Sequence, residues 1–273
     1  METEFIKLQH KTINSITNLL ESYKDVELIF ITGSHSKSEE SSFSDIDISF
    51  VFSDSSRPQK KEIFNKVTRL YPSLCALWLY DKNGLFLYQN GVRLDLDFLT
   101  QTDLEDWDLS NVKIIYDPQN KYHEITHSVT KPVSAPKPKW RNEDGDIIDW
   151  FYWMFRQAYC YIKRGKTNKR RSFNKLYNGQ TSLNSIREKL LEMKVYLYGK
   201  WDYMNEIDSN YASKISLTFS DFNPDNMALA TRKLFDLFEV TAAEYCEKEG
   251  RAFPKEKVIA MRKLFDDFDN VID

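Results

Sequence analysis

The chain has 273 residues, and its 41% hydrophobic and 14% aromatic residues are enough to bury a core, which excludes a disordered protein. Its net charge is -3 and its basic residues gather only locally, between Lys163 and Arg171, which argues against a nucleic-acid partner. No stretch is apolar enough for a membrane span or a signal peptide, and the cysteines (Cys75, Cys160 and Cys246) form no CxxC motif. We therefore expect a cytoplasmic protein with reduced thiols and no membrane partner.

The first half of the chain alternates between helical and strand-like patterns. Apolar residues at helical spacing predict an amphipathic helix between Phe5 and Tyr23 and a surface helix over Arg57–Leu70. Short runs rich in β-formers predict strands at Val26–Thr32, Ile46–Phe52, Leu74–Tyr80, Leu85–Tyr88, Val92–Leu99 and Lys113–Tyr116. Asn83-Gly84 and Asn90-Gly91 predict tight turns, so we expect an antiparallel or mixed sheet.

The second half of the chain has a different pattern. The sequence KPVSAPKPK, from Lys131 to Lys139, excludes a helix and predicts a linker or an extended crossover. Helical spacing follows at Asp144–Arg164, Leu183–Tyr198, Pro224–Gly250 and Pro254–Ile272. The predicted fold class is α+β: a mixed sheet flanked by helices in residues 1–130, a linker at 131–142, and a helical bundle at 143–273 that binds the substrate.

Carboxylates and a glycine turn in the first half carry the predicted chemistry. Alternation along Ile46–Phe52 places Asp45, Asp47 and Ser49 on one face of a strand. Two neighbouring carboxylates suit Mg²⁺, which prefers a few hard oxygen ligands and the oxygens of phosphates. A third carboxylate on another strand, Asp95 by preference, would complete a two-metal clamp or accept a proton from an attacking hydroxyl. The sequence leaves both roles open.

Gly33 and Ser34 follow the first predicted strand, and ten residues separate Ser34 from Asp45. Glycine lets the backbone turn sharply and approach a ligand, and the Ser34 hydroxyl and neighbouring amides can donate hydrogen bonds to phosphate oxygens. The same segment ends at Lys37, a further candidate for nucleotide binding. His35 has no partner at metal-ligand spacing, so we expect it to be a loop side chain.

This order of a hydrophobic strand, Gly-Ser, a gap, Asp-x-Asp and a later strand carboxylate resembles the polymerase-β-like nucleotidyltransferase superfamily. Within it the chain is similar to the bacterial aminoglycoside 6-adenylyltransferases of the streptomycin-modifying type, through GSHSKSEESSFSDIDISFVFSD, RLDLDFLT, IIYD and DWFYWMFRQAYCYIKRGK. The resemblance implies that ATP is the co-substrate, Mg²⁺ the metal and an aminoglycoside the acceptor, and that AMP is transferred with release of pyrophosphate. The aminoglycoside 6-adenylyltransferases typically have an arginine after the Gly-Ser, where this chain has His35.

Further side chains are candidates with two interpretations each. The resemblance implies that Lys163 contacts the triphosphate, whereas a solvated lysine near a helix end is the plainer interpretation. Asp97 and Asp149 would contact the amines of a polycationic acceptor, or are polar neighbours and surface charges. Two other functions stay open, namely a nucleotidyltransferase with a lincosamide or another acceptor, and a non-catalytic nucleotide-binding or antitoxin-like module. The sequence does not indicate the oligomeric state.

Overall fold

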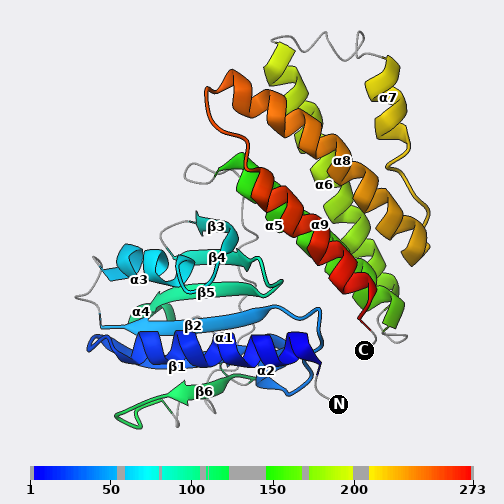
Figure 1. The fold of residues 1–273 in the computed structure, drawn as a ribbon. Coiled ribbons are helices and arrows are strands. Elements are labelled where there is room, and N and C mark those ends of the chain that lie inside the picture. The colour runs from blue at the N-terminus through cyan, green and yellow to red at the C-terminus, as the bar shows by residue number, and fades with distance from the viewer. Residues whose placement is uncertain are drawn as a thin grey trace. The chain divides into compact units, whose positions relative to one another are not determined.

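The computed structural model describes residues 3–53, 59–79, 82–104, 109, 111–122, 146–167, 172–198 and 209–271. The chain divides between Asp149 and Trp150 into two compact units. The predicted linker at 131–142 lies outside the described residues, and the predicted domain bounds stay a prediction. Strands and helices occur together in the first unit and helices alone in the described part of the second, which confirms the α+β class (Figure 1).

The first unit is built around a mixed six-stranded sheet with the order β3-β4-β5-β2-β1-β6. Its elements are α1 (Glu4–Glu21), β1 (Val26–Thr32), α2 (Gly33–Ser36), β2 (Ile46–Phe52), α3 (Gln59–Thr68), β3 (Ser73–Leu79), β4 (Asn83–Tyr88), β5 (Arg93–Thr100), α4 (Gln101–Leu104) and β6 (Lys113–Tyr116). β2 and β5 are parallel neighbours, and the other pairs are antiparallel. The two strands that carry the candidate carboxylates therefore lie side by side.

Alternation along the strands separates a core face from a polar face. Ile46, Ile48 and Phe50 of β2 are fully buried in a core that also contains residues of α1 and α3, and Figure 1 shows α1 lying along the sheet. Side chains of Leu94, Leu96 and Phe98 on β5 belong to the same core. Since successive side chains point to opposite faces, Asp47 and Asp95 lie on the other face, as the alternation predicts.

One of the two predicted Asn-Gly turns is wrong. Asn90-Gly91 forms the turn between β4 and β5, where Gly91 has a φ of 84°. Asn83 and Gly84 instead begin β4, where Asn83 lies opposite Leu79 and Asp97. Tertiary contacts override the local signal, because the Asn83 amide donates to the Asp97 carboxylate and a Cβ at Gly84 would lie 2.8 Å from the Phe86 ring.

The described part of the second unit consists of helices, whose bounds are α5 (Ile147–Thr167), α6 (Ser172–Tyr198), α7 (Ser209–Ser216), α8 (Pro224–Lys248) and α9 (Lys255–Asp269); the first turn of α5 still belongs to the first unit. Aromatic rings form much of its core, with Phe151 packed 4.7 Å from Phe238 between centroids. The sequence missed the short polar α7 and the first half of α6, where Asn178 and Gly179 are weak helix formers. Among the described residues, none of the helices combines the length and hydrophobicity of a membrane span.

Candidate functional site

Three predicted carboxylates come together at one end of the β2–β5 pair. Asp45 lies directly before β2, Asp47 lies within it, and the parallel register places Asp95 of β5 opposite Asp47. One carboxylate oxygen from each residue lies within 4.8 Å of the other two, which is close enough for all three to bind one cation. The side-by-side geometry follows from strand alternation and from the pairing of these two strands.

Gly33 brings the backbone of α2 against this cluster. Its φ is 69°, in the left-handed region that glycine adopts without strain. A Cβ at this position would collide with the Asp47 carboxylate, so the close approach also requires the missing side chain. The Ser34 carbonyl accepts hydrogen bonds from the amides of Lys37 (3.2 Å) and Glu39 (3.0 Å), which closes the turn and leaves the Lys37 side chain exposed.

Arg93 is a member of the site that the sequence analysis did not identify. It begins β5 two residues before Asp95, and its guanidinium donates to both oxygens of that carboxylate, from Nε at 3.2 Å and from Nη2 at 2.9 Å. Nη2 also lies 3.5 Å from an oxygen of Asp45. The signal was present in the sequence, because residues two apart on a strand share a face.

The charges of the cluster are incompletely balanced by the protein. Burial, together with the nearby carboxylates of Asp45 and Asp95, raises the pKa of Asp47 to about 8, while the Arg93 guanidinium opposes this shift. A cation held by three hard carboxylate oxygens would relieve this repulsion. The donor set therefore fits Mg²⁺, and Asp45, Asp47 and Asp95 are the residues that would hold it.

Residues 14–130 match the family "Polymerase beta, Nucleotidyltransferase". The resemblance inferred from Gly33, Ser34 and the carboxylates is thereby confirmed for this part of the chain, and the first unit has the α+β nucleotidyltransferase fold. No curated protein matches the sequence.

Solved structures similar to this chain include three with low TM-scores, and these likenesses support no conclusion about substrate. An aminoglycoside 6-adenyltransferase from Bacillus subtilis has 13% identity and a TM-score of 0.37, over 96% of this chain and 99% of that one. A STING-associated CdnE c-di-GMP synthase from Capnocytophaga granulosa has 13% identity and a TM-score of 0.30, over 87% and 82%. A nucleotidyltransferase-like protein from Exiguobacterium sibiricum has 12% identity and a TM-score of 0.24, over 96% and 91%.

The two predicted acceptor contacts have protein partners in the nucleotidyltransferase unit. Asp97 accepts hydrogen bonds from the Ser49 hydroxyl at 3.0 Å and from the Asn83 amide. Burial raises the pKa of Asp97 to about 6 against the lowering effect of these bonds. Asp149 accepts a hydrogen bond of 3.4 Å from the Ala76 amide on β3, which is the strand at the edge of the sheet. Neither residue belongs to the cluster of Asp45, Asp47 and Asp95.

Lys163 lies on α5 in the second unit, and its side chain is only 13% exposed. Its ammonium forms an ion pair with Asp269 of α9 and lies 5.5 Å from the centre of the Tyr159 ring. Asp269 also accepts hydrogen bonds of 2.6 Å from the Tyr159 hydroxyl and from Arg232. Lys163 is therefore part of a charged network within its own unit, and its contact with a triphosphate stays a prediction.

His35 differs from the loop side chain that the sequence predicts. It lies in the short helix α2 and is 5% exposed. Burial lowers the pKa of its imidazole below the usual value, because desolvation disfavours the charged ring, although the nearby Glu40 carboxylate opposes this effect. His10 of α1 packs edge-on against its ring, a contact that sequence spacing does not reveal.

Proposed function

We propose that this chain is a Mg²⁺-dependent nucleotidyltransferase that transfers AMP from ATP to a hydroxyl of an aminoglycoside antibiotic, most closely of the streptomycin type. The observation that carries the proposal is the cluster of Asp45, Asp47 and Asp95 beside the left-handed Gly33. It lies in the segment that matches the nucleotidyltransferase family. The transfer forms a bond between the acceptor oxygen and the α-phosphorus, breaks the bond to the β-phosphate oxygen, and releases pyrophosphate.

In the proposed reaction the carboxylates position charge around the nucleotide. Asp45 and Asp47 hold Mg²⁺, which when bound neutralises phosphate oxygens as they gain charge. Asp95 either completes the ligand set or takes the proton of the attacking hydroxyl, and a base in that position would contribute about 10²- to 10⁴-fold. Arg93 orients Asp95 in both cases, because its two hydrogen bonds fix the plane of the carboxylate.

The nucleotide and the acceptor are assigned to further residues as part of the same proposal. The Ser34 hydroxyl, the amides of the turn and Lys37 bind phosphate oxygens, and Lys163 is a further proposed contact of the triphosphate. The acceptor assignment is supported by the sequence resemblance, and carboxylates suit its amino and guanidinium groups. Asp97 and Asp149 are the proposed contacts.

Release of pyrophosphate tests the proposal directly. The full chain is incubated with ATP, Mg²⁺ and, one at a time, streptomycin, other aminoglycosides and a lincosamide, with the Asp47→Asn variant as the inactive control. We expect release that depends on Mg²⁺ and is greatest with streptomycin. If pyrophosphate is released only with a lincosamide or another aminoglycoside, the streptomycin-type acceptor is refuted and the nucleotidyltransferase activity is retained. Nucleotide binding without release for any acceptor would support the non-catalytic module instead.

A further inference from the structure

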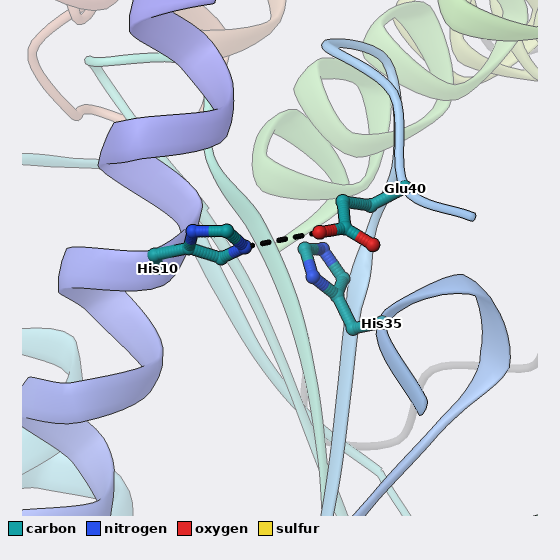
Figure 2. Close-up of side chains that lie close together, drawn as sticks. All are labelled: His10, His35 and Glu40. Carbon is teal, nitrogen blue, oxygen red and sulfur yellow. Dashed lines mark hydrogen bonds and ion pairs between the residues drawn. The ribbon is translucent and has the colours of Figure 1, made fainter. Parts of the chain in front are cut away.

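A second cluster of metal-ligating side chains lies in the first unit and has no role in the proposed transfer. It consists of His10 from α1, His35 from α2 and Glu40 from the loop after α2, and Figure 2 shows the three side chains pointing toward one another. One potential ligand atom from each lies within 4.8 Å of the other two. This is the spacing that a single metal ion requires of its ligands.

The contacts within the cluster keep its members in place. His10 Nε2 lies 3.1 Å from an oxygen of Glu40, and the rings of His10 and His35 pack edge to face with centroids 6.0 Å apart. Next to His10, the buried Gln9 amide donates to the backbone carbonyls of Ser41 (3.2 Å) and Ser44 (3.1 Å). The loop that carries Glu40 is thus fixed to α1 independently of the histidines.

Two polar atoms of the cluster are buried without a hydrogen-bond partner among the described residues. They are Nε2 of His35 and the second carboxylate oxygen, Oε2, of Glu40. Burying a polar atom without a partner is costly, and such atoms in a folded protein commonly indicate a ligand. Both atoms belong to residues of this cluster, and a bound ion would supply a partner there.

The chemistry of the cluster differs from that of the three aspartates. Imidazole nitrogen is a borderline ligand that suits Zn²⁺ and similar first-row transition ions, whereas Mg²⁺ prefers oxygen alone. Burial favours the neutral imidazole of His35, which is the form that binds metals. The His10 side chain is 45% exposed, which gives an ion a route to the cluster, while the Glu40 side chain is only 16% exposed.

We propose that His10, His35 and Glu40 form a second metal site, which binds Zn²⁺ or a chemically similar first-row transition ion. Three protein ligands leave one position of a tetrahedral ion for water or another donor. The ion would join α1 to the segment that carries Gly33 and Ser34, so its binding would stabilise the turn beside the three aspartates. The bound ion would therefore stabilise that turn without taking part in the transfer reaction itself.

Calorimetric titration of the metal-stripped full chain with zinc chloride tests the site, with excess Mg²⁺ present to fill the aspartate cluster. We expect one zinc ion per chain in the wild type, and at least about tenfold weaker binding in His10→Gln and in His35→Gln. The matched control is Glu21→Gln, which removes an exposed carboxylate at the end of α1 outside the cluster and should bind like the wild type. Glu40→Gln keeps the shape of the side chain and should weaken binding as well.

Thermal melting separates lost binding from lost folding. Zinc should raise the melting temperature of the wild type and of Glu21→Gln, because an ion that binds only the folded state stabilises it. It should not raise that of His10→Gln, whose metal-free melting temperature should stay near that of the wild type because His10 is partly exposed. Equal zinc affinity in the wild type, His10→Gln and His35→Gln, or absence of zinc binding in the wild type, would overturn the proposal.

Discussion

Replacing Asp47 by Asn should change how the stability of the metal-free protein depends on pH. The folded-state pKa of Asp47 is raised from 3.8 to about 8, first by burial and then by Asp45 and Asp95. At a pH between these two pKa values, Asp47 is ionised in the unfolded chain, whereas it keeps its proton in the folded chain. Folding therefore takes up a proton, and stability is lost as the pH rises from the unfolded pKa through the folded pKa.

The size of this pH dependence follows from the uptake of one proton on folding. Each pH unit in this window removes about 1.4 kcal/mol from the free energy of unfolding, so the loss between pH 5 and pH 7 is about 3 kcal/mol. Asn resembles the protonated carboxyl group and does not titrate, so the Asp47→Asn variant escapes this loss. For a chain of this size, 1 kcal/mol of stability corresponds to about 2–4 °C in melting temperature. The difference in melting temperature between the variant and the wild type should therefore grow by about 3–6 °C for each unit that the pH rises.

The assay is thermal melting in EDTA at pH 5, 6 and 7. Asp267→Asn is the control, because Asp267 forms an exposed surface pair with Lys263 and its loss should leave the pH dependence unchanged. Adding Mg²⁺ at pH 7 should raise the melting temperature of the wild type but hardly that of Asp47→Asn. Parallel pH profiles for the variant and the wild type in EDTA would refute the argument from carboxylate repulsion.

Three further predictions concern neighbouring residues. If Asp95 is the base, Asp95→Asn should lower kcat far more than it weakens ATP binding, whereas if Asp95 is a metal ligand, the variant should weaken Mg²⁺-dependent ATP binding. Measurements of turnover and titrations of ATP binding distinguish these two roles. Unchanged kcat and unchanged ATP affinity would exclude Asp95 from the site. Gly33→Ala should cost about 1–3 kcal/mol, because it strains the backbone and displaces the Asp47 carboxylate; an unchanged melting temperature would contradict this. Arg93→Met should lower the melting temperature in EDTA, because it removes the guanidinium that pairs with Asp95 and Asp45, and Mg²⁺ should restore part of the loss; a melting temperature that does not fall would refute this account.

Local patterns predicted the parts of the fold and site that depend on short-range geometry. Strand alternation placed Asp45 and Asp47 together on one face because a side-chain period of two is a property of any strand. The antiparallel pairing of β4 with β5 also followed from a local signal, the turn at Asn90-Gly91. The pairing of β2 with β5 brings Asp95 to the same place, and the sequence supported it only through the resemblance to known nucleotidyltransferases.

The sequence failed where a distant contact decides the local structure. Asn83-Gly84 has the composition of a turn, but the hydrogen bond from Asn83 to Asp97 and the rings around Gly84 hold it in a strand. Arg93 resembles a surface cation at the start of a strand, and its burial is explained only by the carboxylates of Asp95 and Asp45 around it. In both cases the deciding partner lies on another strand or becomes relevant only once the sheet has formed.

His10, His35 and Glu40 show the same limitation in its strongest form. Metal sites are recognised in a sequence when the ligands recur at short, fixed spacings on one element. Here one histidine lies on α1 and the other in the short helix α2 beyond the first strand, so no spacing rule connects them. They meet because the apolar face of α1 packs on the sheet and Gln9 binds the loop after α2. A cluster of this kind becomes visible only in three dimensions, when the hydrophobic packing of α1 is known.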